Sequence, residues 1–357
     1  MAAVDLDNPQ SFDALDTGGM LTLVEEFGEQ CSQAIELGRG TPLPESRDFR
    51  AVVTLGMGGS AIGGDLLRSC VGNGMAQPWF INRDYGLPRW VGEGTLMLVS
   101  SYSGNTEETL AAFEEGISRG ATAICLTSGG RLEQLAKERG LPMVRLPGGL
   151  PPRAALGYSF FPTAVILGRM GLAAVTEEDL SETLEVIRRS ANGWGRARPA
   201  AENQAKSMAL MLENRVPVIY AGDELLGSVA TRWRNQFNEN SKILAHSNVF
   251  PELNHNEIEG WEGADPMGGQ VHLIFLQDQE DSPPIQRRMK VTDEIIGKRA
   301  AGISRLWCEG TGRIARVFSL VCLGDFVSVY LALIRGQDPT TIRNINCLKE
   351  ALANVPE

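Results

Sequence analysis

A glycine-rich run near residue 58 has residue types that could bind an anion. Residues 52–55 predict a short buried strand, and a helical pattern begins at Ala61. A strand, a glycine turn and a helix in this order leave backbone N–H groups free at the positive end of the helix dipole. Gly58 and Gly59 lie in this turn, and Ser60 adds a hydroxyl. A phosphate-binding loop and a closely packed strand-to-helix turn are both open interpretations.

A second loop, rich in hydroxyl groups, favours the phosphate interpretation. Residues 96–99 predict another buried strand, and Ser101, Ser103 and Thr106 follow it. Thr106 precedes two glutamates, which is typical of a helix start. In a parallel sheet, the loops at the carboxyl ends of neighbouring strands meet at one crevice. A glycine-rich loop beside a hydroxyl-rich loop suits a monophosphate better than an extended dinucleotide.

The same glycines also fit a dinucleotide-binding fingerprint. The spacing Gly56-x-Gly58-x-x-Ala61 is that of the loop that holds the pyrophosphate of a nicotinamide cofactor. Because this fingerprint alone is a weak signal, a dehydrogenase is kept only as an alternative.

Three further residues could carry acid–base chemistry. Glu239 ends a predicted helix, where the helix dipole disfavours a carboxylate and makes it a better proton acceptor. His255 lies between asparagines that could orient its imidazole, and Arg153, in a proline-rich loop, could stabilise an oxyanion. Each also has a structural interpretation, namely a surface glutamate, a loop-capping histidine and a surface arginine. Lys242 and His246 are predicted to be structural or surface residues.

Composition and length bound the class of protein. The chain has 357 residues, of which 43% are hydrophobic and 22% charged. This length exceeds the usual size of a single core and predicts two domains. No apolar run reaches the length of a membrane span. The formal charge of −11 argues against a broad nucleic-acid surface. We therefore expect no membrane or nucleic-acid partner.

The cysteines and the N-terminus bear on the compartment. The six cysteines are scattered without C-x-x-C pairs, so they are predicted to be buried thiols, neither disulfides nor metal ligands. The N-terminus lacks a basic region followed by an apolar core, so no signal peptide is predicted. The expectation is a cytoplasmic protein without a metal site.

Strands alternate with helices along the first half of the chain. Strands are expected at 51–55, 78–82, 96–99, 121–126 and 143–146, with helices near 61–73, 106–119 and 131–139. This rhythm predicts an α/β fold with a doubly wound parallel sheet. A lead-in with a helix over 20–37 precedes it, so we assign residues 1–50 to the lead-in and 51–195 to the first domain.

The second half repeats this rhythm. A Gly/Pro-interrupted segment at 193–199 predicts a domain boundary, so the second domain spans 196–357. Strands are expected at 216–220, 270–276 and 302–308, and helices near 203–213, 225–237, 286–298 and 341–352. The apolar run at 320–334 predicts a buried helix.

Four patterns carry a family resemblance. They are Gly56-x-Gly-Gly-Ser60-x-x-Gly-Gly-Asp65, Ser101-x-Ser103-Gly-x-Thr106, Glu239-Asn-x-Lys242 and Pro251-Glu-x-Asn-His255-Asn. Together they resemble the bifunctional phosphoglucose/phosphomannose isomerases, which belong to the sugar isomerase (SIS) domain proteins. The resemblance covers nearly the whole chain. Many SIS proteins share the phosphate loops, so the pairing of Glu239 with His255 is its more specific part.

The resemblance implies a fold, a reaction and an assembly. It implies two SIS domains, each a doubly wound five-stranded parallel sheet flanked by helices, and a homodimer. It implies an aldose–ketose isomerase that interconverts glucose 6-phosphate, and mannose 6-phosphate, with fructose 6-phosphate through a cis-enediol. No metal and no organic cofactor is implied.

The resemblance also assigns roles to individual residues. The sugar phosphate would be held by Gly58, Gly59, Ser60, Ser101, Ser103 and Thr106. Glu239 would move the proton between C2 and C1, and Arg153 would stabilise the cis-enediolate. His255, from the partner subunit, would assist ring opening together with Lys349 of the closing helix. The main alternative is a non-catalytic SIS module that senses a sugar phosphate, which would keep both loops but have no use for Glu239, His255 and Arg153.

Overall fold

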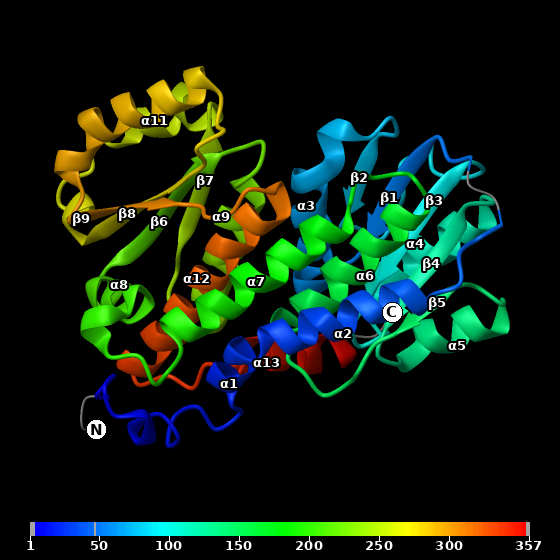
Figure 1. The fold of residues 1–357 in the computed structure, drawn as a ribbon, viewed down its shortest axis with the longest axis horizontal. Coiled ribbons are helices and arrows are strands. Elements are labelled where there is room, and N and C mark those ends of the chain that lie inside the picture. Colours follow the sequence, from blue (N-terminus) through cyan, green and yellow to red (C-terminus); the bar gives the residue numbers. More distant parts are fainter. Residues whose placement is uncertain (1–3, 46–47, 355–357) are drawn as a thin grey trace.

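The computed structural model describes residues 4–45 and 48–354, and its strands form two separate parallel sheets (Figure 1). The first has five strands in the order β2-β1-β3-β4-β5. Their bounds are β1 (Ala51–Leu55), β2 (Trp79–Asn82), β3 (Thr95–Ser100), β4 (Thr122–Thr127) and β5 (Met143–Arg145). The predicted first sheet is thereby confirmed, to within two residues at each strand end.

Burial on both faces explains why the first sheet has near-continuous apolar strands. Every residue of β1 and β3 is buried. Along β1, Val52 packs into one hydrophobic cluster, while Val53 and Leu55 pack into another on the opposite face. Helices cover both faces, so no polar alternation is needed.

The second sheet has four strands in the described part of the chain, so the prediction of five strands in each sheet is wrong for this domain. The order is β7-β6-β8-β9, with β6 (Val216–Gly222), β7 (His246–Phe250), β8 (Val271–Gln277) and β9 (Gly302–Trp307). The edge strand β7 was not predicted. Its sequence, His-Ser-Asn-Val-Phe, is mostly polar and only its last residue is buried, so it lacks the apolar pattern of a central strand.

Thirteen α-helices surround the sheets in the described residues. Those of the first half are α1 (Met20–Glu25), α2 (Phe27–Gly40), α3 (Gly58–Val71), α4 (Glu107–Ser118), α5 (Gly130–Glu138), α6 (Leu156–Arg169) and α7 (Glu177–Trp194). Those of the second half are α8 (Gln204–Leu212), α9 (Gly227–Glu239), α10 (Glu257–Gly260), α11 (Pro283–Ile296), α12 (Arg313–Ile334) and α13 (Arg343–Ala353). The helix expected over 20–37 is therefore two helices, α1 and α2.

Seven short 3₁₀ helices complete the described secondary structure. They are η1 (Pro9–Ser11), η2 (Gly72–Gly74), η3 (Pro152–Ala154), η4 (Ala200–Glu202), η5 (Glu252–His255), η6 (Met267–Gln270) and η7 (Gly297–Arg299). Two of them matter for the site, because η3 contains Arg153 and η5 ends at His255.

Long helices join the two halves into one core. The central helix α12 packs against α7, α8 and α9, and α2 packs against α6. One hydrophobic cluster therefore extends from Val52 of the first sheet to Ile274 of the second. The predicted lead-in begins at residue 1, and the predicted second domain ends at residue 357. Residues 1–3 and 355–357 lie outside the described part.

The buried helix predicted at 320–334 begins earlier, at Arg313. Within the described residues, α12 is the one helix long and apolar enough to cross a membrane by length and composition. The expectation that no apolar run reaches this length was therefore wrong. Because 94% of its apolar window is buried inside the protein, α12 is a core helix.

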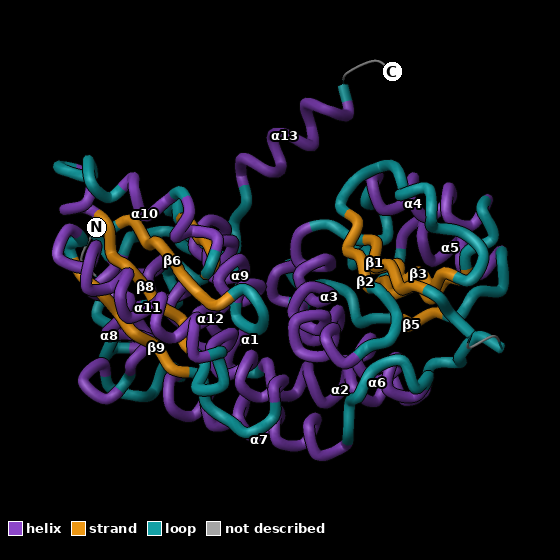
Figure 2. The backbone as a smooth tube through the Cα atoms, turned by 90° about the horizontal axis from the view of Figure 1, so that it is seen from above, coloured by secondary structure: helices purple, strands orange, loops and turns teal. Residues whose placement is uncertain are grey.

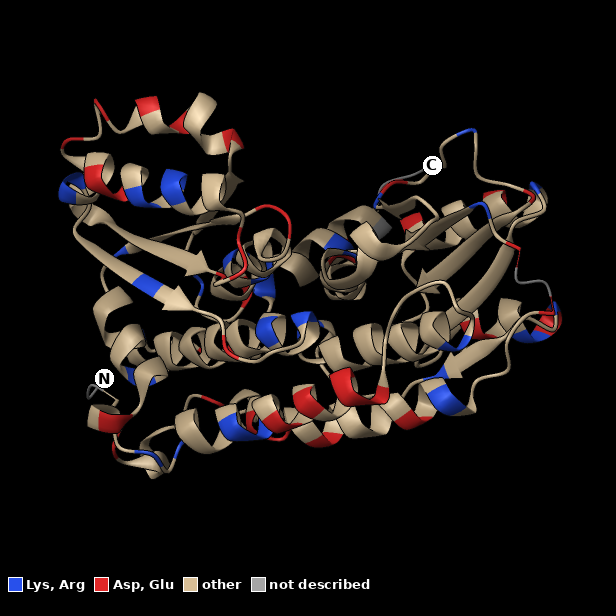
Figure 3. Cartoon of the chain, turned by 45° about the horizontal axis from the view of Figure 1, so that its top comes forward, with Lys and Arg blue, Asp and Glu red and all other residues tan. Residues whose placement is uncertain are grey.

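The cysteines mostly follow the prediction. Five of the six are buried and unpaired, whereas Cys347 is exposed on α13. That helix projects away from the rest of the molecule, which Figure 2 shows clearly. Acidic and basic residues are interspersed along the chain in the view of Figure 3.

Candidate functional site

The two predicted phosphate loops meet at the carboxyl edge of the first sheet. Ser60 lies in the first turn of α3, directly after β1, and Tyr102 lies in the loop after β3. The backbone N–H of Tyr102 donates a hydrogen bond to the Ser60 hydroxyl across 3.2 Å. The expectation that both loops share one crevice is thus confirmed by a direct bond between them.

The hydroxyls of the second loop differ in exposure. Thr106 is the residue before α4, and its hydroxyl lies 2.9 Å from that of Ser101. Ser101 is completely buried, while Ser103 is exposed and its hydroxyl accepts the N–H of Asn105 at 3.3 Å. The buried Ser101 therefore holds the Thr106 hydroxyl in place. Among the predicted hydroxyl residues of the two loops, Ser60, Ser103 and Thr106 retain exposed surface.

Glycine at position 59 lets the first loop approach the loop of Arg153. A Cβ atom on Gly59 would lie 2.5 Å from the Pro152 carbonyl oxygen, which is closer than such atoms can come. Gly58 has a φ of +48°, a backbone conformation that L-residues rarely adopt. These two glycines therefore bring the start of α3 against η3.

Arg153 is buried at the junction of the two halves, so the alternative interpretation of a surface arginine is wrong. Its Nε donates to the Asn240 side-chain oxygen at 2.6 Å, and its Nη2 donates to the carbonyl oxygens of Thr340, at 3.0 Å, and Pro339. Burial lowers the pKa of Arg153, and the nearby Glu239 carboxylate opposes this. An arginine so held stays cationic at neutral pH.

Glu239 is the last residue of α9 and points toward this guanidinium. Its carboxylate oxygen lies 3.5 Å from Nη1 of Arg153, and its side chain is 32% exposed. The remaining face of the Glu239 carboxylate is thus open to solvent, and to a ligand, beside a fixed positive charge.

A second buried arginine fixes the backbone of the first. Arg232 of α9 donates through Nη2 to the Arg153 carbonyl oxygen at 3.2 Å and to the Asp325 carboxylate at 2.6 Å. Both Arg232 and Asp325 are buried. The helix that ends at Glu239 therefore holds the η3 loop in place.

Lys242, predicted to be structural or on the surface, takes part in this arrangement. Its ammonium donates to the carbonyl oxygens of Glu239 at 2.6 Å and Asn240 at 3.3 Å, and it lies 3.4 Å from that of Pro339. Partial burial and the positive charge of Arg153 lower its pKa to about 8. Asn240, completely buried, was also missed, although both residues lie in the Glu239-Asn-x-Lys242 pattern.

The site lies between opposite edges of the two sheets. The hydroxyls of Ser69 and Ser228 are 3.0 Å apart, so the end of α3 meets the beginning of α9 and the helices run antiparallel. The start of α3, at the carboxyl edge of the first sheet, therefore faces the end of α9. A helix that follows a parallel strand ends at the amino edge of its sheet, which places Glu239 there.

His255 and Lys349 are not brought to this pair within one chain. His255 lies in the segment after β7, and this segment folds back over the second sheet, since the Glu257 carboxylate contacts His246, at the start of β7, and Asn248. Both His255 and Lys349 are exposed, and their side chains make no hydrogen bond or ion pair with the described residues.

Comparison with known proteins identifies the family. A family model described as "Bacterial phospho-glucose isomerase C-terminal SIS domain" matches residues 201–352. The bifunctional phosphoglucose/phosphomannose isomerase of Caldicellulosiruptor bescii is 40% identical over 95% of this chain and 100% of its own. The enzyme of that name from Thermoplasma acidophilum is 36% identical over 92% of this chain and 98% of its own.

Solved structures show the same fold at lower identity. A glucose-6-phosphate isomerase-like protein from Thermus thermophilus superposes with a TM-score of 0.64 at 20% identity, covering 95% of this chain and 98% of its own. The C-terminal domain of glucosamine-fructose-6-phosphate aminotransferase from Francisella tularensis gives a TM-score of 0.66 at 15% identity over 90% and 98% of the two chains. By its full-length sequence similarity, the chain belongs to the bifunctional phosphoglucose/phosphomannose isomerase family.

Proposed function

We propose that this protein is an aldose–ketose isomerase that interconverts glucose 6-phosphate and mannose 6-phosphate with fructose 6-phosphate. The observation that carries the proposal is the Arg153–Glu239 pair, held where the phosphate loops of the first domain face the end of α9. Membership of the isomerase family supports the choice of substrates.

The phosphate group would bind at the carboxyl edge of the first sheet. The free N–H groups at the start of α3 and the hydroxyls of Ser60 and Thr106 offer donors to a dianion there. Phosphate lies at C6, away from the reacting carbons, so its binding energy positions the sugar without taking part in the chemistry.

Proton transfer on the sugar would then take place at the junction of the two domains. Glu239 removes the proton from C2 of the open-chain aldose and returns it to C1, the electron pair shifts through a cis-enediolate, and the hydroxyl proton of O2 moves to O1. Arg153 offers a fixed positive charge to the developing oxyanion, and its buried bonds to Asn240 and Thr340 leave little to reorganise.

Ring opening would require a residue from a second copy of the chain. The exposed His255 side chain makes no hydrogen bond or ion pair with Arg153 or Glu239 of its own chain, so it is available to the site of a partner. We therefore propose a homodimer in which His255 of each chain completes the partner's site together with Lys349. This arrangement makes two equivalent composite sites related by a two-fold axis.

The site favours catalysis over a sensor of sugar phosphates. A sensor requires the phosphate loops alone, whereas this chain also holds a partly exposed carboxylate beside a buried arginine.

Five buried, unpaired cysteines among the described residues support a reducing compartment, and we propose that the protein is cytoplasmic.

A coupled assay tests the function. Purified protein with EDTA is given glucose 6-phosphate or mannose 6-phosphate, and fructose 6-phosphate is measured. We expect product from both sugars and no loss of activity through chelation. Binding of both sugars without any fructose 6-phosphate would support the sensor instead.

A further inference from the structure

The helix α13 presents an apolar face that nothing in its own chain covers. All its residues from Arg343 to Leu352 are exposed, and the helix extends away from the body (Figure 2). Ile345, Leu348 and Leu352 are 38%, 59% and 61% exposed. Their spacing places them on one side of a helix. An exposed apolar row of this kind marks an interaction surface.

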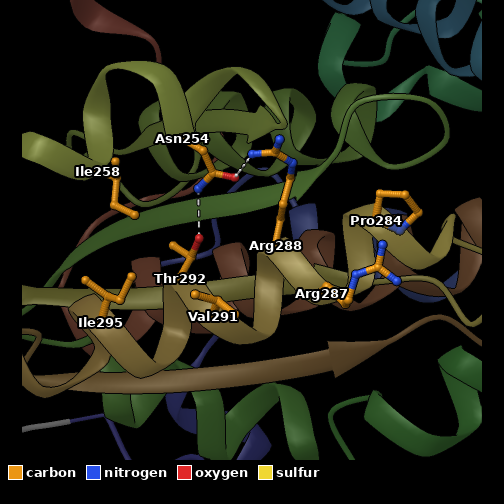
Figure 4. A pocket seen from close by; sticks show the side chains of 8 residues that line it. All are labelled: Asn254, Ile258, Pro284, Arg287, Arg288, Val291, Thr292 and Ile295. Carbon is orange, nitrogen blue, oxygen red and sulfur yellow. Dashed lines mark hydrogen bonds between the residues drawn. The ribbon is translucent and has the colours of Figure 1, made fainter.

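An apolar groove, here called the α11 groove, lies on the second domain and is about as long as α13 (Figure 4). It has a volume of about 510 Å³. It is lined by Asn254, Ile258, Pro284, Arg287, Arg288, Val291, Thr292 and Ile295. Val291 and Ile295 are 50% and 56% exposed, so the floor of the α11 groove is apolar and open.

Hydrogen bonds hold the walls of the α11 groove in place. Asn254 donates to the Thr292 hydroxyl at 2.8 Å, and Arg288 lies 3.4 Å from the side-chain oxygen of Asn254. Figure 4 shows Asn254 pointing toward α11 between these two partners. The groove is therefore formed before any ligand binds, and its wall is the residue next to His255.

We propose that α13 of one copy docks into the α11 groove of a second copy. The proposal rests on the proposed function, in which His255 of the partner reaches the site of this chain. α13 begins three residues after Thr340, whose carbonyl oxygen accepts a bond from Arg153, so it starts beside that site. A partner that inserts His255 there brings Asn254 and Ile258 next to α13.

Length and chemistry match between the two surfaces. The eleven residues of α13 extend about 16 Å, and so do the positions from Pro284 to Ile295 along α11. Three apolar side chains of α13 meet the apolar floor of the groove. Arg287 and Arg288 lie in the half of the groove nearer Pro284, where they favour the negative, carboxyl end of a docked helix.

Docking would also set the position of Lys349. On a helix wheel, Lys349 lies at the margin of the row formed by Ile345, Leu348 and Leu352. In the described chain it has no contact that orients it. Burial of the apolar row against a partner fixes the rotation of α13 and thereby holds Lys349 at the edge of the composite site.

The first test is the oligomeric state of full-length variants. Leu348→Glu on α13 and Ile295→Glu in the groove place a charge in the proposed contact, so each should raise the dimer dissociation constant at least tenfold in sedimentation experiments. Leu210→Glu on α8 is the matched control, since Leu210 is 50% exposed and outside both surfaces. Dimers of unchanged affinity in both contact variants would overturn the proposal.

The second test is a cross-link between copies, which needs no loss of folding. Leu348→Cys and Ile295→Cys are made separately in a Cys347→Ser background and mixed under mild oxidation. We expect a disulfide-linked dimer from the mixture, and no such product when Leu210→Cys replaces Leu348→Cys. Absence of the cross-link, with wild-type dimers present, would contradict docking.

These readouts are independent of the reaction. A cross-linked dimer without isomerase activity would support the docking and refute the proposed function. An active dimer that forms no cross-link would support the function and refute the docking.

Discussion

The guanidinium Nη1 of Arg153 lies 3.5 Å from the carboxylate of Glu239, and the two residues come from different halves of the chain. Arg153 follows the first sheet, and Glu239 ends the first long helix after β6. The relative placement of the two halves therefore sets the distance between the proposed base and the proposed oxyanion stabiliser. Anything that shifts one half against the other should affect catalysis.

Replacing Glu239 with glutamine should remove the proton shuttle while keeping its shape. Because Gln cannot accept the C2 proton, isomerisation should fall by ~10²–10⁴. The coupled assay measures the rate, and NMR measures exchange of the C2 proton with solvent. Glu178→Gln, on an exposed turn of α7, should leave both unchanged. Substantial turnover by Glu239→Gln would refute its assignment as the base.

Replacing Arg153 with methionine should affect stability as well as rate. The variant loses hydrogen bonds from a buried cation to Asn240 and Thr340, each worth about 1.5–3 kcal/mol. Thermal unfolding should therefore occur at a clearly lower temperature, and turnover should be lost. Glu239→Gln, in contrast, should unfold near the wild-type temperature, because Glu239 is partly exposed.

Arg153→Lys provides the conservative comparison. Lysine keeps the charge but cannot reproduce the guanidinium fork, so partial recovery of stability with poor turnover is expected. A fully active Arg153→Lys enzyme would mean that geometry at this position matters less than charge.

Removing the hydroxyls of Ser60 and Thr106 together should weaken phosphate binding. Charge-assisted bonds to a dianion contribute about 1.5–3 kcal/mol each, so KM should rise strongly with a smaller fall in kcat. Steady-state kinetics with glucose 6-phosphate measure the split. Ser118→Ala, whose hydroxyl bonds Glu115 on α4, is the control. A wild-type KM in the double variant would place the phosphate elsewhere.

Much of the fold could be predicted because the first sheet follows simple rules. Strands buried on both faces, such as β1 and β3, have apolar runs that stand out from any neighbour. The strand β7 could not be predicted, because an edge strand needs few apolar residues. The start of α12 was misplaced because Arg316, buried against Asp278 at 3.3 Å, interrupts the apolar pattern.

The site residues could be proposed from motifs, but their relations could not. No sequence pattern states that Arg153 is buried against Asn240, or that Lys242 binds the carbonyl of Glu239. These contacts depend on how two halves pack through α3 and α9. The fold of the segment around His255 likewise follows only once the contacts of Glu257 with β7 are known.

Lys242 should make stability depend on pH in the alkaline range. Its pKa is lowered from 10.5 to about 8 by burial and by Arg153, against the attraction of Asp338 and Glu239. Between these values the folded chain has lost this proton while the unfolded chain still binds it, so the free energy of unfolding gains a contribution that rises with pH. Urea unfolding of wild type and Lys242→Met across this range should show that difference. Parallel curves would mean that Lys242 titrates normally.

Mixed dimers test whether the active site is shared. Glu239→Gln and His255→Ala should each be inactive alone. In a mixed dimer one site carries both changes and the other carries neither, because Glu239 acts in its own chain and His255 in the partner's. Random exchange of equal amounts makes about half of the dimers mixed, each with one intact site, so activity should recover to roughly one quarter of wild type.

The control for this experiment is a pair of changes within one chain. The double variant Glu239→Gln/His255→Ala, mixed with wild type, also forms hybrid dimers, but each of their sites then carries one change. Hybrid dimers should be inactive, so activity should fall to about one quarter of the undiluted wild type instead of one half. If His255 serves its own chain, complementation fails and this mixture keeps half its activity. The two mixtures therefore give opposite results for a shared and an unshared site.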